Sequence, residues 1–292
     1  MVRRAIFTLP LPGGRVVTLG ERTLIMGILN ITPDSFADGG VHFNVDRAVE
    51  AGLRMVEAGA DILDIGGEST RPGADQVGAD EEMRRVLPVI ERLRPQIRAV
   101  ISIDTYKASV AEETVARGAS IVNDISGLQY DPELGTVVAR TGAALVLMHT
   151  RGRSRTMYEH AVYQNVTAEV VAELATAIDR ARAAGVLRES IILDPGFGFA
   201  KRAEHSFELL ANLPQLAELD RPLLAGPSRK SFLKDALGDR LPAEREWGTA
   251  AAVTASVLGG AHIVRVHGVR EMADVVRVAD RVRAYAGKPE LT

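Results

Sequence analysis

Residues 46–67, DRAVEAGLRMVEAGADILDIGG, hold the alternation that decides the fold. The first part places apolar side chains at Val49, Leu53 and Val56, a spacing that predicts an amphipathic helix from Asp46 to Ala58. The DILDIGG that follows is short and apolar without strict alternation, which is typical of a parallel strand buried on both faces. A helix that leads into such a strand is the repeating unit of an α/β fold.

The same unit recurs along the chain. Helical periodicity returns at Val170 to Ala184 and at Val269 to Val282. Eight apolar runs end at or next to Asn30, Glu68, Asp104, Asp124, His149, Asp194, Ser228 and His267. Eight such units predict one α/β domain over residues 1–292, a single (β/α)8 TIM barrel, although a doubly wound open sheet can use the same local pattern.

A short β-hairpin is predicted before the first of these runs. Residues 6–9 and 16–19 have the composition of strands, and Pro12-Gly13-Gly14 between them is a turn sequence. We expect residues 1–22 to form a cap on the barrel rather than a domain of their own.

The composition excludes several classes of protein. Hydrophobic residues make up 46% and charged residues 25% of the chain, which excludes a disordered or fibrous protein. The absence of Cys excludes disulfides, thiolate zinc sites and iron–sulfur clusters. A net charge of −3 gives little support for nucleic-acid binding, and no apolar run approaches the ~18 residues of a membrane span. We expect a cytoplasmic protein whose partners are small molecules, with neither nucleic acid nor membrane among them.

Polar residues stand at the carboxyl ends of the predicted strands. In a barrel these ends share one rim, where active sites of this fold are built. The residues concerned are Asn30, Asp104, Asn123, His149, Asp194, Ser228, Arg265 and His267. Any one of them could instead cap the following helix, but eight on one rim favour an active site.

Several longer motifs resemble those of the dihydropteroate synthase family. They occur in the family's order and cover most of the chain: MGILNITPDSFADGG (26–40), GGESTRPGA (66–74), SIDT (102–105), VNDISG (122–127), LMH (147–149), LDPGFGFAK (193–201), SRKSF (228–232) and VRVH (264–267). The resemblance implies a TIM barrel, usually a homodimer. It also implies a transferase of folate biosynthesis that condenses 6-hydroxymethyl-7,8-dihydropterin pyrophosphate with p-aminobenzoate, forming 7,8-dihydropteroate and pyrophosphate.

The resemblance assigns a pterin site to the rim. Asp194 would accept the N–H groups of the 2-amino-pyrimidinone edge, a bidentate arrangement that suits a carboxylate. The other pterin-binding residues implied are Asp104, Asn123, Met148, Phe199 and Lys230. From the residues alone, Asp194 could instead cap a helix, and the pattern favours core packing for Met148 and Phe199.

A diphosphate site is implied at the last strand. Arg265 and His267 alternate with Val264 and Val266, so both polar side chains point the same way. Barrel phosphate sites commonly lie near strands 7 and 8. By resemblance, Asn30 also contacts the diphosphate and supplies one ligand to Mg²⁺, the expected cofactor, with phosphate and water oxygens completing the shell.

The remaining implied residues belong to p-aminobenzoate and to the chemistry. The p-aminobenzoate pocket would contain Phe36, Thr70, Arg71, Pro72 and Ser231, and sulfonamides that mimic this substrate would bind there. The implied catalytic residues are Asp38, Lys230 and Asp104. The family mechanism is dissociative and needs no protein nucleophile.

The chain departs from the family pattern at two places, and two alternative functions remain. Gly268 stands where many family members have Asp, which could loosen the support of His267. Arg151, Arg153 and Arg155 form a charged loop that we interpret as solvated, or as attracting anions. A methyltetrahydrofolate:corrinoid methyltransferase-like protein should lack the SRKSF and STRPGA elements, and a catalytically silent paralogue should have lost a site residue such as Asp194.

Overall fold

The barrel is closed by eight parallel strands. The computed structural model describes residues 4–31, 41–69 and 76–286. The strands are β3 (Leu24–Asn30), β4 (Ile62–Gly66), β5 (Val100–Asp104), β6 (Ile121–Asp124), β7 (Ala144–Met148), β8 (Ile191–Asp194), β9 (Leu224–Ala225) and β10 (Ile263–Val266). They pair in the order β8-β7-β6-β5-β4-β3-β10-β9, and a parallel bridge between Leu193 and Leu223 joins the two ends. The predicted (β/α)8 barrel is therefore confirmed, and the open-sheet alternative is wrong.

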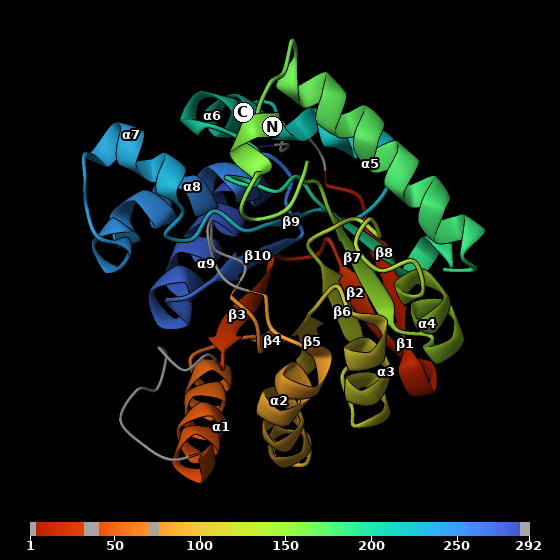
Figure 1. Cartoon of the computed structure of the whole chain (residues 1–292). Coiled ribbons are helices and arrows are strands. Elements are labelled where there is room, and N and C mark those ends of the chain that lie inside the picture. Colours follow the sequence, from red (N-terminus) through yellow and green to blue (C-terminus); the bar gives the residue numbers. More distant parts are fainter. Residues whose placement is uncertain (1–3, 32–40, 70–75, 287–292) are drawn as a thin grey trace.

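Helices surround the strands (Figure 1). They are α1 (Val41–Glu57), α2 (Ala79–Leu93), α3 (Ala108–Ala116), α4 (Leu134–Thr141), α5 (Val166–Ala183), α6 (Ala203–Ala211), α7 (Lys234–Leu237), α8 (Glu246–Leu258) and α9 (Val269–Tyr285). The main hydrophobic core lies between these helices and the sheet. All five residues of β4, of β5 and of β7 are buried, as expected of strands covered on both faces. In the described part of the chain, no helix is long and apolar enough to cross a membrane.

The predicted hairpin is present and closes one end of the barrel. Strands β1 (Phe7–Leu11) and β2 (Arg15–Leu19) pair antiparallel around the short turn Pro12–Gly14. Leu9, Leu11 and Leu19 are buried in a second apolar cluster with the first residues of the barrel strands. The hairpin and this cluster fill the amino-terminal end of the barrel, so a site within the barrel can open only at the carboxyl-terminal rim.

The strands and helices differ from the sequence prediction mainly at their ends. The run PLLAGPS forms only the two-residue β9, because Pro222 and Pro227 have no N–H to donate to a neighbouring strand. Helix α5 begins at Val166 instead of Val170, since the Asn165 side chain accepts the Ala168 N–H at 3.0 Å and caps it there.

Candidate active site

The polar residues predicted for the rim are brought together at the carboxyl ends of the strands. The register pairs Asn30 with Gly66, Gly66 with Asp104, and Asp104 with Asn123. On the neighbouring strands, Met148 pairs with Asp194. Asn123 in turn pairs with Val146, so Met148 and Asp194 lie two residues beyond this row at the same rim, and the strand ends together form one polar floor.

An arginine joins two carboxylates at the centre of this floor. Arg265 Nε donates to Asp64 Oδ2 at 2.6 Å, and its Nη2 donates to Asp104 Oδ2 at 2.7 Å. The Asn123 amide also donates to Asp64 Oδ2, at 2.9 Å. Asp64 is fully buried and Asp104 is 5% exposed, so the guanidinium is the counter-ion that allows both to sit inside the barrel.

Asp64 was missed by the sequence analysis. It lies within β4, two residues before the rim position Gly66, and so was not among the strand-end residues. The signal was present, because an acidic residue in the middle of the apolar run DILDIGG cannot be buried without a partner. Such a residue indicates a cation from another strand, here Arg265.

Burial shifts the protonation of the floor toward neutral forms. It raises the pKa of Asp104 to about 7 against the opposing effect of Arg265, and the nearby Asp64 carboxylate raises it further. Burial also raises the pKa of Asp194, which Lys230 and the Gly196 N–H oppose. The pKa of Lys230 is lowered to about 8, first by burial and against the attraction of Asp194. Asp104 and Lys230 can therefore change protonation close to neutral pH.

The pKa of Asp104 gives a testable pH dependence of stability. The unfolded chain releases this proton near pH 4, whereas the folded protein holds it until about pH 7. The free energy of unfolding should therefore fall as pH rises through this window, by about 1 kcal/mol per unit from pH 5 to 6.5. Asp104→Asn cannot ionise and should lack this contribution. Urea unfolding of both proteins at several pH values tests this, and parallel pH profiles would contradict it.

Three buried polar atoms on the floor have no hydrogen-bond partner among the described residues. They are Asp64 Oδ1, Asp104 Oδ1 and Ser102 Oγ. Asp64 pairs with Ser102 in the β4–β5 register, and Asp64 and Asp104 share Arg265, so the three belong to one locality. Unpartnered buried polar groups cost free energy, and a polar ligand edge would satisfy them.

Asp194 and Lys230 lie beside this floor. Asp194 Oδ1 accepts the Gly196 N–H at 2.7 Å. A Cβ placed on Gly226 would lie 3.9 Å from both Asp194 Oδ2 and Lys230 Nζ, so these two charged atoms border the same small space. Lys230 Nζ also lies 4.5 Å from the centroid of the Phe199 ring. The Asp194 carboxylate, the Lys230 amine and the Phe199 ring thus lie together at the rim.

The other predicted residues are placed as follows. Met148 is buried at the end of β7. Ser231 is exposed at the first position of the turn Ser231–Leu233. His267 follows β10, and its backbone N–H donates to Ser228 Oγ at 3.2 Å while its Nδ1 lies 3.0 Å from the same oxygen. The predictions for Phe36, Asp38, Thr70, Arg71 and Pro72 concern positions outside the described residues.

Similarity to known proteins fits this site. Residues 26–267 match the family described as pterin binding enzyme. A dihydropteroate synthase of Synechocystis sp. is 48% identical over 94% of this chain and 95% of its own length. The chain belongs to the dihydropteroate synthase family. This membership makes it a transferase.

Two solved members of the dihydropteroate synthase family share the fold closely. One, from Xanthomonas albilineans with 4-aminobenzoic acid, is 44% identical with a TM-score of 0.88, covering 95% of this chain and 99% of that one. The other, from the same organism in complex with 7,8-dihydropteroate, is 42% identical with a TM-score of 0.84, covering 94% of this chain and 99% of that one.

The oxygen donors at the rim suit Mg²⁺ only when a bound diphosphate supplies further coordinating atoms. Within the described residues, no group of three or more His, Cys, Asp or Glu could hold a metal ion. Asn30 Oδ1 faces the floor, because a Cβ on Gly66 would lie 3.6 Å from it and 3.7 Å from Asp104 Oδ2. One amide oxygen is a hard donor of the kind Mg²⁺ accepts, and it fits an ion that takes its other ligands from a diphosphate and water.

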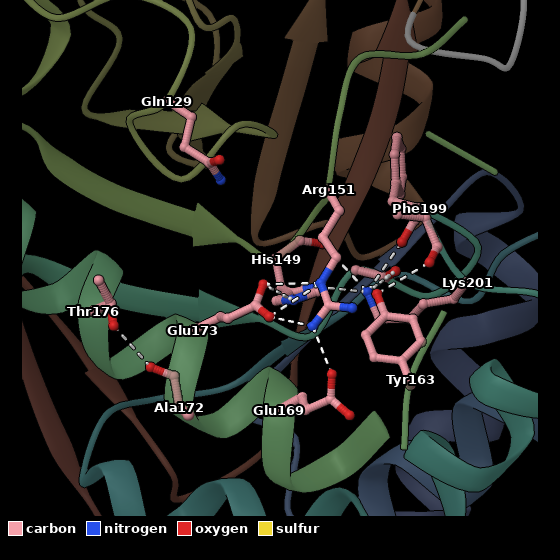
Figure 2. A network of polar contacts seen from close by, with 12 residues as sticks. Gln129, His149, Arg151, Tyr163, Glu169, Ala172, Glu173, Thr176, Phe199 and Lys201 are labelled. Carbon is pink, nitrogen blue, oxygen red and sulfur yellow. Dashed lines mark hydrogen bonds and ion pairs between the residues drawn. The ribbon is translucent and has the colours of Figure 1, made fainter. Parts of the chain in front are cut away.

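The two departures from the dihydropteroate synthase family have structural explanations. A Cβ on Gly268 would lie 2.3 Å from Glu246 Oε1, so the Glu246 side chain occupies the space that a longer residue would need. The interpretation of Arg151 as part of a solvated loop is wrong. Its guanidinium is half-buried, pairs with Glu169 and Glu173, and stacks 4.1 Å from the Tyr163 ring centroid (Figure 2).

Proposed function

We propose that this protein makes 7,8-dihydropteroate from 6-hydroxymethyl-7,8-dihydropterin pyrophosphate and p-aminobenzoate, with release of pyrophosphate. The observation that carries the proposal is the set of unpartnered buried polar atoms on the barrel floor, next to Asp194 and Lys230. A planar ring with polar atoms along its edges fits such a floor, and the two Xanthomonas albilineans structures hold 4-aminobenzoic acid or the product in the same family fold.

The pterin is held by its polar edges and by its faces. The Asp194 carboxylate accepts the 2-amino and ring N–H donors, while Asn123 and Asp104 satisfy further ring atoms. Lys230 donates to the ring carbonyl and nitrogen. Met148 and Phe199 cover the ring faces. Burial holds the pKa of Lys230 at about 8, so its ammonium is the main form at pH 7 and weakens as a donor above that value.

The diphosphate is bound where β10 ends. Among the described residues, the floor contacts of Arg265 use Nε and Nη2, which leaves Nη1 as the guanidinium nitrogen to contact the leaving group. His267 and Asn30 add polar contacts from the neighbouring strand ends. Mg²⁺ held by Asn30 and the diphosphate would neutralise negative charge on the leaving group.

The reaction proceeds by dissociation. The bond between the pterin methylene carbon and the diphosphate oxygen breaks first, and its electron pair leaves with the oxygen. The ring delocalises the resulting cation, and Asp38 and the buried carboxylates of the floor stabilise its positive charge. The amine nitrogen of p-aminobenzoate then forms the new C–N bond and loses one proton. No protein nucleophile takes part.

The p-aminobenzoate pocket is assembled from Phe36, Thr70, Arg71, Pro72 and Ser231. Ser231 opens the turn after Lys230, so its hydroxyl can meet the benzoate carboxylate while the amine faces the pterin. Sulfonamides that mimic p-aminobenzoate should compete for the same pocket, which makes the protein a sulfonamide target.

Replacing Ser231 by alanine should raise the KM for p-aminobenzoate about tenfold, because one hydrogen bond to a charged group is worth roughly 1.5 kcal/mol or more. The KM for the pterin substrate should change less than twofold. Steady-state kinetics with each substrate varied in turn measures both values. An unchanged KM for p-aminobenzoate would remove Ser231 from the pocket.

The proposal includes the oligomeric state and the location of the protein. A homodimer is supported by large apolar side chains left exposed on α8 and α9, namely Trp247, Val278, Val282 and Tyr285. A cytoplasmic location is supported by the composition and by the small-molecule substrates.

Release of pyrophosphate that depends on both substrates tests the proposed function. The wild-type protein should release pyrophosphate in proportion to product, whereas Lys230→Ala should slow the reaction by about 100-fold or more, because it removes a charged donor from the pterin ring. A wild-type protein that binds the pterin pyrophosphate without turnover would instead be a catalytically silent paralogue.

A further inference from the structure

Lys201 is a buried amine whose hydrogen-bond partners are neutral groups. It follows the LDPGFGFA segment after β8 and is only 1% exposed. Its Nζ donates to the carbonyl oxygens of Gly196 at 3.1 Å and Phe199 at 3.0 Å, and lies 2.7 Å from His149 Nδ1. No carboxylate of the described residues forms an ion pair with it. Burial lowers the pKa of Lys201 well below its ordinary value, so this amine is kept in place by neutral acceptors.

The two carbonyls belong to the loop that carries the pterin-facing groups. Gly196 gives its N–H to Asp194, and Phe199 faces Lys230. The loop lies tightly against the end of β7, because a Cβ on Gly196 would lie 2.1 Å from the His149 carbonyl oxygen. Lys201 thus fixes both ends of a segment whose shape sets the positions of the Asp194 carboxylate and the Phe199 ring.

His149 anchors Lys201 to the barrel wall. Its Nδ1 faces the Lys201 amine and accepts, so the ring proton is on Nε2, which lies 3.0 Å from Glu173 Oε2 on α5 (Figure 2). Burial and the nearby Lys201 lower the pKa of His149 to about 4, which keeps the ring neutral and Nδ1 free to accept.

A second set of contacts keeps Glu173 in place. Arg151 Nε donates to Glu173 at 3.0 Å, and Arg151 Nη2 pairs with Glu169 at 2.8 Å. Tyr163, under the Arg151 guanidinium, donates its hydroxyl to the carbonyl of Ala200 at 3.0 Å. Two independent connections therefore run from α5 and the β7–α5 segment to the loop after β8.

We propose that Lys201 is a positioning residue of the pterin site, which holds the loop from Asp194 to Phe199 in its binding shape through His149 and Glu173. It does not touch the substrate. This inference rests on the proposed function, because it assigns the loop to the pterin. It identifies a role for the last residue of the LDPGFGFAK motif and for the histidine of the LMH motif, neither of which is used in the chemistry.

Lys201→Met tests the proposal, because methionine fills the space and cannot donate. We expect the Kd for the dihydropterin pyrophosphate, measured by calorimetry, to rise about tenfold or more. The KM for p-aminobenzoate at saturating pterin substrate should change less than twofold. Arg4→Met is the matched control, because Arg4 is also a buried basic side chain that donates to a backbone carbonyl, but at the opposite end of the barrel. It should lower the melting temperature and leave the pterin Kd unchanged.

Two substitutions of His149 separate positioning from general destabilisation. His149→Asn keeps an acceptor near the Nδ1 position, whereas His149→Gln keeps a polar group near Nε2 and Glu173 and loses the acceptor for Lys201. We expect His149→Asn to bind the pterin substrate within about threefold of wild type and His149→Gln to weaken it as Lys201→Met does. The reverse order, or a Lys201→Met protein with unchanged pterin Kd, would overturn the proposal. A wild-type protein that does not bind the pterin pyrophosphate would overturn the proposed function itself.

Discussion

Replacing Asp194 by alanine is expected to weaken binding of the dihydropterin pyrophosphate at least about 100-fold, with turnover falling below detection. The carboxylate is buried at 4% exposure, where hydrogen bonds to a charged acceptor are strong. Its Oδ1 already accepts the Gly196 N–H, so removal also frees the loop that follows β8. Both effects act on the pterin.

Calorimetry with the pterin substrate measures this loss, and Asp194→Asn is the matched variant. Asparagine has the same shape and can keep the contact to Gly196, but it presents an NH₂ donor toward the N–H groups of the pterin. We therefore expect it to bind nearly as weakly as alanine while melting closer to wild type. Retained affinity in either variant would show that another group recognises the pterin edge.

The second large effect is expected from Arg265→Met. Removing the guanidinium leaves Asp64 and Asp104 buried without their cation, a change that typically costs about 3–5 kcal/mol of stability. Activity should also be lost, since the same residue faces the diphosphate in the proposed complex. Urea unfolding at pH 8, above the pKa of Asp104, measures the loss of stability.

Two comparisons make the Arg265 result specific. Arg277→Met removes an exposed arginine that pairs with Asp274, and should change the free energy of unfolding by less than about 0.5 kcal/mol. Adding Asp64→Asn to Arg265→Met removes one of the two buried carboxyl groups that have lost their cation, and should restore part of the lost stability. If Arg265→Met were as stable as wild type, the ion pairs of the floor would not be needed to hold the buried carboxylates.

The barrel and its rim could be predicted because they depend on local patterns. The runs that end at Asn30, Asp104 and Asp194 are strands in the structure, and all three end at the same rim of the barrel. The hairpin turn at Pro12-Gly13-Gly14 was likewise predictable, because the conformation of a turn depends on the residue types within it.

The pairings within the site could not be predicted in the same way. Arg265 contacts Asp64 and Asp104 from a distant part of the chain, and only closure of the barrel brings the three together. No sequence pattern distinguishes these carboxylates from a diphosphate as partners of Arg265. The same holds for Lys201 and His149, whose contact depends on how two loops pack.

The contacts of Arg151 could not be predicted either, because they depend on how a helix packs against the loop. The loop with Arg151, Arg153 and Arg155 is expected to be solvated, yet an aromatic ring and two glutamates from α5 enclose the Arg151 guanidinium. Those glutamates follow Arg151 by 18 and 22 residues, a spacing with no meaning until α5 packs beside the loop.

Mass spectrometry of the product shows whether this protein synthesises 7,8-dihydropteroate. The wild-type protein is incubated with dihydropterin pyrophosphate, isotope-labelled p-aminobenzoate and Mg²⁺, and the mixture is searched for labelled 7,8-dihydropteroate. We predict that the labelled product forms in the wild type and is absent from an Asp194→Ala reaction. Binding of the pterin substrate without any labelled dihydropteroate would contradict the account and leave a pterin-binding barrel without this activity.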